Sequence, residues 1–245
     1  MDVPYKHRSD AGKKLARRLS RYANRPDVLV LALPRGGVPV AYEVARALHA
    51  PLDVFIVRKL GVPGDEELAM GAIASGGVRV MNEEVTRDII FPQTIIDSIL
   101  QREGEELRRR ERLYRGDHPP LNVEGRTVIL VDDGLATGST MRAAAVALRQ
   151  MRPLKVIIAV PVAAPETCAE FRSKVDEVIC AATPEPFMAV GAWYKDFTQT
   201  SDQEVSDLLE RAAFHQQDLF PPVSDPQEEV FPIGGMAAQK THFKE

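Results

Sequence analysis

The chain has 245 residues, of which 44% are hydrophobic and 27% charged, a composition typical of a globular protein. Its 31 basic and 35 acidic residues give a net charge of −4, so no global basic field is available to attract nucleic acid. No apolar run has the length of a membrane span, and the first residues lack the apolar core of a signal peptide. We therefore expect a cytoplasmic protein without nucleic-acid or membrane partners. Cys168 and Cys180 could form a disulfide, but without a secretory signal free thiols are expected.

Strands and helices are expected to alternate in the first part of the chain. Helical spacing of apolar residues predicts a helix over residues 9–23, with Ser9 as its N-cap. The continuous apolar runs 28–33 and 53–57 predict strands buried on both faces, separated by a helix over 38–49. This order implies parallel strands joined by a right-handed crossover.

Residues 60–77 break this pattern, because glycines, a proline and three consecutive acids are typical of a mobile loop. A short strand is expected at 78–81 and a long helix at 92–114. The charges between residues 102 and 115 could suggest a nucleic-acid arm, but their mixed signs favour a solvated helix face. The ion pairs expected on this face are Glu105–Arg109, Glu106–Arg110 and Glu111–Arg115.

The second half of the chain continues the alternation. The predicted strands are 128–131, 155–160 and 177–180, and the predicted helices are 141–151, 165–172 and 203–215. Together these elements predict an α/β fold with a mainly parallel central sheet flanked by helices. We expect one domain over 1–215, with a core at 28–180 and a small hood formed by 1–25 and 181–215. Residues 216–245 are Pro-rich and polar, which predicts a poorly ordered tail.

One stretch, residues 128–140, joins a buried strand to two carboxylates and a small-residue turn. Asp132 and Asp133 stand where the strand should end, and their carboxylates can accept hydrogen bonds from sugar hydroxyls or hold a cation. The glycines and hydroxyls that follow allow backbone N–H groups at the next helix to bind a phosphate. The stretch therefore predicts a site for a phosphorylated sugar. The alternative is a strand end with solvated acids and a capped helix.

Residues 128–140 resemble the phosphoribosyl-diphosphate (PRPP) signature of the type I phosphoribosyltransferases, which have a Rossmann-like fold. Asp-Asp-x-Leu-Ala-Thr-Gly-x-Thr is especially similar to the adenine-type members. The loop 34–37 and the basic pair Arg58-Lys59 match two further sites of that family, in the same order. The resemblance covers about residues 28–180.

The resemblance implies a role for each matching residue. Asp132 and Asp133 would bind the ribose hydroxyls, directly or through Mg²⁺. The 5′-phosphate would lie on the backbone amides and hydroxyls of the loop formed by Gly134, Ala136, Thr137, Gly138, Ser139 and Thr140.

The pyrophosphate group would bind to Arg35, Gly36 and Gly37. Family members often have a non-proline cis peptide bond at this place. Arg58 and Lys59 would add positive charge. Taken alone, residues 34–37 also fit an ordinary β-to-α turn.

Residues 60–77 fall where the family has a flexible loop that closes over the reacting centre and excludes water. Glu67, or its neighbour Glu66, is the candidate for moving the proton of the acceptor base. A solvated acidic loop is the alternative. Some purine enzymes carry an Asp proton acceptor in the phosphate loop, but that position is Ala136 here, so an acid–base group must come from elsewhere.

Aromatic residues in the predicted hood could stack on a planar base. Phe187 and Trp193 are the main candidates, followed by Tyr194 and Phe197. The same residues would also suit a lid that packs on the core, and both interpretations remain open.

The predicted function is Mg²⁺-dependent transfer of ribose 5-phosphate from PRPP to a nitrogenous base, with release of pyrophosphate. The alternative is a PRPP-binding sensor or regulatory protein without transferase activity. A P-loop nucleotide hydrolase is disfavoured because no Gly-x-x-x-x-Gly-Lys-Ser/Thr motif occurs. The sequence does not identify the acceptor base. Relatives commonly pair, which is compatible with a homodimer, although no residue pattern indicates one.

Overall fold

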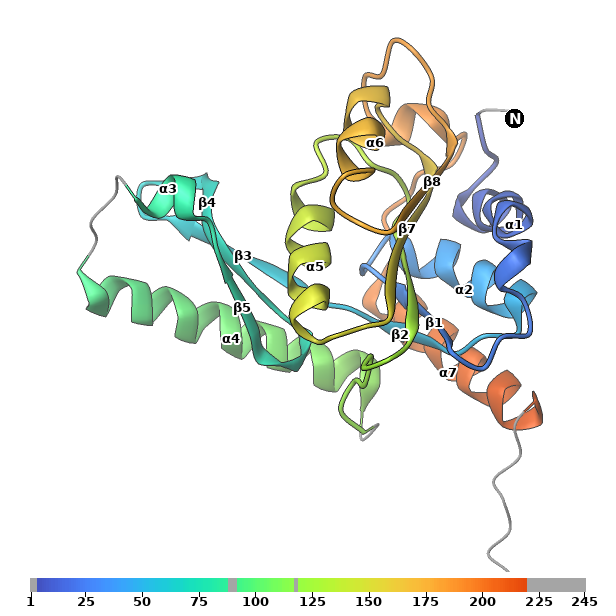
Figure 1. The fold of residues 1–245 in the computed structure, drawn as a ribbon, viewed down its shortest axis with the longest axis horizontal. Helices are drawn as coiled ribbons and strands as arrows, with labels where there is room; N and C mark the ends of the chain where they lie inside the picture. Colours follow the sequence, from blue (N-terminus) through green and yellow to red (C-terminus); the bar gives the residue numbers. More distant parts are fainter. Residues whose placement is uncertain (1–3, 88–91, 117–118, 220–245) are drawn as a thin grey trace, which may run out of the picture.

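The structure is a computed structural model that describes residues 4–87, 92–116 and 119–219. Its centre is a five-stranded parallel sheet with strand order β2-β1-β6-β7-β8 (Figure 1). The strands are β1 (Val28–Ala32), β2 (Leu52–Val54), β6 (Thr127–Val131), β7 (Lys155–Val162) and β8 (Glu177–Ala182). The predicted α/β fold with a mainly parallel sheet is therefore confirmed.

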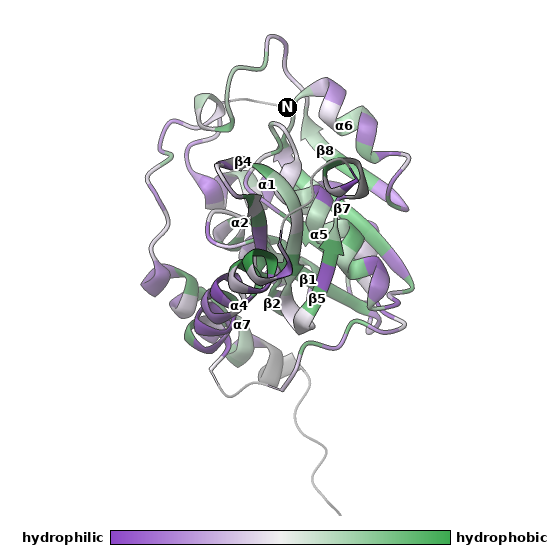
Figure 2. Cartoon of the chain, turned by 90° about the vertical axis from the view of Figure 1, so that its left-hand side faces the viewer, coloured by the Kyte–Doolittle hydropathy of each residue, from purple (hydrophilic) through white to green (hydrophobic). Residues whose placement is uncertain are grey.

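Helices cover both faces of this sheet, which explains why its strands are apolar throughout. In β1, Val28 and Val30 pack into one buried cluster, whereas Leu29 and Leu31 pack into a second cluster on the opposite face. Figure 2 shows strands of the central sheet coloured mainly as hydrophobic, and helices around them that carry both hydrophilic and hydrophobic residues. The first cluster includes side chains of α1 (Arg8–Arg18), α2 (Gly37–Leu48), α4 (Gln93–Arg115) and α7 (Asp202–Leu219), and the second those of α5 (Ser139–Gln150) and α6 (Pro165–Phe171). Four short helices, η1 (Ser20–Tyr22), η2 (Ser75–Gly77), α3 (Glu83–Thr86) and η3 (Val190–Trp193), complete the described helices.

The prediction that residues 60–77 form a loop without regular secondary structure is wrong. The segment belongs to a three-stranded antiparallel sheet in the order β3-β4-β5, which Figure 1 shows at one side of the central sheet, beside α4. Gly64, at φ +87°, lies in the turn between β3 and β4, so its role is turn geometry. Leu60, Met70 and Ile73 are buried in the core cluster that includes α4, which holds the hairpin in place. The strands are β3 (Val57–Val62), β4 (Asp65–Ala74) and β5 (Val78–Met81).

Several local expectations also differ from the structure. The N-cap of α1 is His7, whose side chain accepts a hydrogen bond from the Asp10 backbone N–H, and not Ser9. Of the three ion pairs expected on α4, only the Glu106–Arg110 pair, at 2.7 Å, is found among the described residues. Glu106 also binds Arg109, and Arg115 binds Asp53 instead, at 3.0 Å.

The expectation of free thiols is also wrong, since Cys168 and Cys180 form a disulfide. Helix α6 packs beside β8, which brings the two Cα atoms to 6.6 Å, within bonding range. Helix α7 extends to Leu219, and the predicted tail from 220 onward lies outside the described residues. None of the described helices is long and apolar enough to cross a membrane.

Candidate functional site

The loop 34–37 and the acidic pair leave the central sheet at the same edge. Ala32 at the end of β1 pairs with Val131 at the end of β6, and the chain continues from β1 to β2 on the opposite side. Ligands of open α/β sheets bind where neighbouring strands diverge in this way.

Two glycines allow the first loop to lie directly against the acids. A Cβ atom on Gly36 would stand 2.0 Å from Asp133 Oδ2, and one on Gly37 would stand 2.7 Å from the Val131 carbonyl oxygen. No other residue type fits these positions without displacing the acids. The peptide bond between Pro34 and Arg35, in the same loop, is cis.

The acidic pair is partly buried and held by three hydrogen bonds. Arg8 Nε donates to Asp133 Oδ2 at 2.8 Å, the Tyr194 hydroxyl donates to the Asp133 carbonyl at 2.5 Å, and the Asp133 N–H donates to Asp132 Oδ1 at 2.8 Å. Burial, and then the charge of Asp133, raises the pKa of Asp132 well above its usual value. Burial also raises the pKa of Asp133, and the hydrogen bond from Arg8 opposes that rise. A cation or hydroxyl donors placed beside the two carboxylates would therefore stabilise their ionised form.

The two carboxylates fit the usual environment of Mg²⁺, which takes one or two protein carboxylates together with substrate phosphate oxygens and waters. The described residues contain no group of three or more His, Cys, Asp or Glu side chains that could hold a metal by themselves. A cation at this site would therefore complete its coordination with oxygens from water or from a substrate.

Arg8 is a site residue that the sequence analysis did not identify. Its side chain is only 11% exposed, its Nη1 donates to the Thr198 carbonyl at 2.7 Å, and its guanidinium lies 3.9 Å from the centre of the Phe197 ring. Arg8 thus ties α1 and the 194–198 segment to Asp133. Because Arg8 and Asp133 are 125 residues apart, no local pattern could have revealed the contact.

The predicted phosphate loop presents unpaired backbone donors at the start of α5. None of the backbone N–H groups from Ala136 to Thr140 donates to a carbonyl in the described part of the chain. Gly138 has a left-handed conformation with φ +71°, a geometry that lets successive N–H groups point to one side. Such an arrangement at a helix N-terminus binds anions.

Helix α6 supports this loop from behind. The Thr167 hydroxyl donates to the Ala136 carbonyl at 2.6 Å, and a Cβ atom on Gly138 would stand 2.7 Å from the Phe171 ring. Arg142 of α5 binds Glu170 of α6 through Nε at 3.1 Å and Nη2 at 2.9 Å. The loop is consequently held in place without a ligand.

The two arginines predicted to bind pyrophosphate have protein partners. Arg35 Nη1 lies 3.7 Å from Asp202 Oδ1, which also accepts a hydrogen bond from the Tyr114 hydroxyl at 2.5 Å. Arg58 donates to Glu103 Oε2 through Nε at 2.9 Å and Nη2 at 2.7 Å. Arg58 and Lys59 lie inside β3 and not after a strand end, because the chain turns from β2 directly into the antiparallel sheet.

The remaining candidates differ in what the structure describes. Glu66 and Glu67 have their backbone in β4, but their side chains lie outside the described part of the structure. The rings of Phe187 and Trp193 stack on each other, with centroids 6.3 Å apart. Trp193 Nε1 is buried and, among the described residues, has no hydrogen-bond partner.

Tyr194 and Phe197 pack within the region predicted as the hood. Their ring centroids are 5.0 Å apart, and Tyr194 also packs on Tyr5, at 5.5 Å. Backbone contacts join the same segments, since the Tyr5 N–H donates to the Trp193 carbonyl at 2.8 Å. The two ends of the predicted hood therefore meet above the acidic pair through Tyr194.

Known proteins resemble this chain over most of its length. A family model described as "Phosphoribosyl transferase domain" matches residues 5–189. A Mycobacterium tuberculosis protein provisionally named a phosphoribosyl transferase is 44% identical over 241 residues, which cover 96% of this chain and 54% of that protein. This chain thus spans about half the length of that relative. The bifunctional protein PyrR of Chloroflexus aurantiacus is 33% identical over 129 residues, covering 51% of this chain and 65% of PyrR.

Among solved structures, the protein TT1426 of Thermus thermophilus superposes with a TM-score of 0.75 at 40% sequence identity. The match covers 84% of this chain and 98% of that one. The family match, residues 5–189, includes both loops and the acidic pair. The chain belongs to the phosphoribosyl transferase domain family.

Proposed function

We propose that this protein transfers the ribose 5-phosphate of PRPP to a nitrogenous acceptor in a Mg²⁺-dependent reaction that releases pyrophosphate. The observation that carries this proposal is the set of N–H groups from Ala136 to Thr140, which donate to no carbonyl in the described part of the chain and directly follow the partly buried pair Asp132–Asp133. Such a site fits a sugar with vicinal hydroxyls and a phosphate. The loop 34–37 lies against the same acids and can receive a second anionic group.

Each part of the site then has a task in the reaction. Asp132 and Asp133 hold the ribose hydroxyls, and bound Mg²⁺ would neutralise charge on the phosphate oxygens. The bond between the ribose and pyrophosphate breaks, a carbon–nitrogen bond forms, and the acceptor gives up its proton. Catalysis would come mainly from orientation and from preorganised charge. Ala136 cannot take the proton, so Glu67, or Glu66, remains the candidate for that step.

Pyrophosphate release from PRPP and Mg²⁺ tests this function directly. Purines, pyrimidines and small amines should be screened as acceptors, with chelator as the metal-free control. We expect release with at least one acceptor and none after chelation. Absence of pyrophosphate release with every acceptor would contradict the proposal, whether or not PRPP binds.

The second candidate is a PRPP-binding regulatory protein. The observation that favours it is Ala136, which leaves the phosphate loop without a carboxylate for proton transfer. In that case PRPP would bind, and a broad acceptor panel would produce no pyrophosphate. Direct binding measurements beside the release assay separate the two functions.

A further inference from the structure

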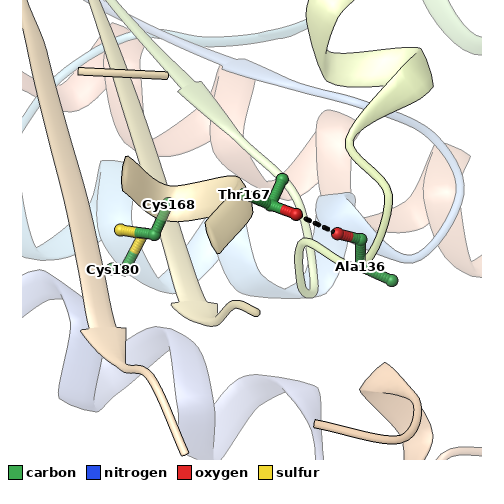
Figure 3. Close-up of a disulfide and its surroundings, with 4 residues drawn as sticks. All are labelled: Ala136, Thr167, Cys168 and Cys180. Carbon is green, nitrogen blue, oxygen red and sulfur yellow. Dashed lines mark hydrogen bonds between the residues drawn. A yellow bond between two sulfur atoms is a disulfide. The ribbon is translucent and has the colours of Figure 1, made fainter. Parts of the chain in front are cut away.

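Helix α6 links a disulfide to the predicted phosphate loop (Figure 3). Cys168 on α6 is bonded to Cys180 on β8, and its neighbour Thr167 donates a hydrogen bond to the Ala136 carbonyl at 2.6 Å. A covalent bond to the central sheet thus lies one residue from a direct contact with the loop.

The position of α6 depends on such contacts, because the helix has only 7 residues and helices of this length are not stable alone. Its inner side chains, Cys168 and Phe171, are buried in the core cluster on that face of the sheet. The disulfide is the covalent member of this set of contacts. Its loss would remove the covalent link between α6 and β8 and leave α6 held by noncovalent packing alone.

Movement of α6 would reach the loop by more than one route. A Cβ atom on Gly138 would stand 2.7 Å from the Phe171 ring and 2.9 Å from Thr167 Cγ2, so the loop rests on the helix. The Arg142–Glu170 pair joins the start of α5 to α6. The N–H groups that would receive a phosphate are therefore positioned by α6.

We propose that Cys168–Cys180 is a thiol–disulfide exchange site that controls the rigidity and anion affinity of the 136–140 loop. The oxidised form holds α6 and the loop in the geometry described above. The reduced form releases α6 from β8 and weakens phosphate binding. The part concerning affinity rests on the proposed function, whereas the part concerning loop rigidity does not.

The exchange requires a dithiol as the reductant. Cys168 is 4% exposed and Cys180 is half-buried, so one thiolate of the reductant attacks Cys180 Sγ and Cys168 leaves as a thiolate that takes up a proton. The second thiolate of the reductant then breaks the mixed disulfide and releases Cys180, which is also protonated. Two electrons pass to the protein, and the reductant becomes a disulfide.

Hydrogen exchange of the full chain tests the rigidity of the loop without any ligand. The protein is compared before and after treatment with dithiothreitol, and alkylation followed by mass spectrometry counts the free thiols. The informative amides are those of Leu135, Arg142 and Cys168, which donate to the carbonyls of Val162, Gly138 and Ala164 next to the 136–140 loop or in α6. We expect their exchange to become about tenfold faster on reduction, while amides of α1 are unchanged. Unchanged exchange in the verified dithiol form, or failure to form the disulfide or to reduce it in the folded protein, would overturn the proposal.

Ribose 5-phosphate binding tests the effect on affinity. Reduction should raise the dissociation constant severalfold, and Cys168→Ser with Cys180→Ser should match the reduced protein under all redox conditions. Thr167→Val, which keeps the disulfide, should loosen the loop in the oxidised protein and make reduction less effective. Thr86→Val removes a similar bond, to the Asn82 carbonyl, and serves as the control. Faster exchange with unchanged binding would refute control of affinity, whereas absence of ribose 5-phosphate binding in both forms would refute the proposed function instead.

Discussion

The two sides of the candidate site are built in different ways. On the β6 side, the N–H groups from Ala136 to Thr140 donate to no carbonyl among the described residues, and α6 supports their loop. On the β1 side, Arg35 faces Asp202, and further along Arg58 binds Glu103. The first side is preorganised, whereas the arginines of the second must exchange one carboxylate partner for a ligand. Preorganised groups bind at a lower cost in reorganisation, so we expect the ribose 5-phosphate part of PRPP to dominate affinity.

Removal of both carboxylates should produce the largest effect on binding. In Asp132→Asn with Asp133→Asn, we expect PRPP affinity to fall on the order of 100-fold, because hydrogen bonds to two charged acceptors are weakened. Isothermal titration with Mg²⁺ present measures the change. Asp97→Asn, on the exposed part of α4, is the control, and equal affinity in the double variant and wild type would show that the acids do not hold the ligand.

The same acids should have the opposite effect on the stability of the ligand-free protein. Burial raises the pKa of Asp132, so the folded state retains protons that the unfolded state has lost, and stability falls as pH rises through the folded-state pKa. Asp132→Asn should therefore raise Tm at neutral pH, and the gain should vanish below about pH 4, where the unfolded-state Asp is protonated. Thermal scans without Mg²⁺ across this pH range check the sign. A lower Tm for the variant at pH 7 would contradict the prediction.

Substitution of Gly138 by Ala should lower the stability of the protein, by an amount that shows how rigidly the phosphate loop packs on α6. Gly138 and Gly125 have similar φ values of +71° and +68°, but a Cβ atom at Gly125 meets nothing within 4 Å. Both Ala variants should lose about 1 kcal/mol of stability from the left-handed backbone. Gly138→Ala should lose about 1–3 kcal/mol more, because its Cβ atom collides with Phe171. Urea unfolding gives the difference, and equal losses would mean that the loop adapts without cost.

Arg8 stands between the two sides and should have a moderate effect. Arg8→Gln removes the cation that orients Asp133, and we expect PRPP affinity to fall about tenfold, with partial recovery in Arg8→Lys. Arg109→Gln, an exposed arginine on α4, controls for the loss of charge. Binding by Arg8→Gln equal to that of wild type would remove Arg8 from the ligand site.

The smallest expected change in affinity concerns Arg35, which must leave Asp202 in order to bind pyrophosphate. Asp202→Asn keeps an acceptor for Tyr114 but removes the charge that faces Arg35. Affinity for inorganic pyrophosphate should rise by no more than about fivefold, since exposed ion pairs contribute at most about 1 kcal/mol. Asp207→Asn, on the same helix, is the control. Weaker binding in Asp202→Asn would indicate that Asp202 supports the ligand and does not compete with it.

The central sheet and the acidic pair were predictable because their signals are local. The apolar runs of β1 and β6 match strands buried on both faces, and Asp132 with Asp133 follows β6 directly. The β3–β4 hairpin was missed because a glycine such as Gly64 is as typical of a tight turn between strands as it is of a mobile loop. The composition of the segment cannot distinguish a hairpin from a loop, because that difference depends on which strands pair in the folded protein.

The sequence by itself determined the order of the central-sheet strands and of the helices that flank them, the α/β class and the strand-to-helix turn at 132–140 that carries the phosphate-binding motif. Hydrophobic periodicity and turn residues act over a few neighbouring positions, and these features need nothing longer. Only the tertiary structure decided that Arg8 binds Asp133, that Arg35 faces Asp202 and that Cys168 bonds Cys180. Each of these pairs joins separate elements, and their proximity depends on how the helices pack around the sheet.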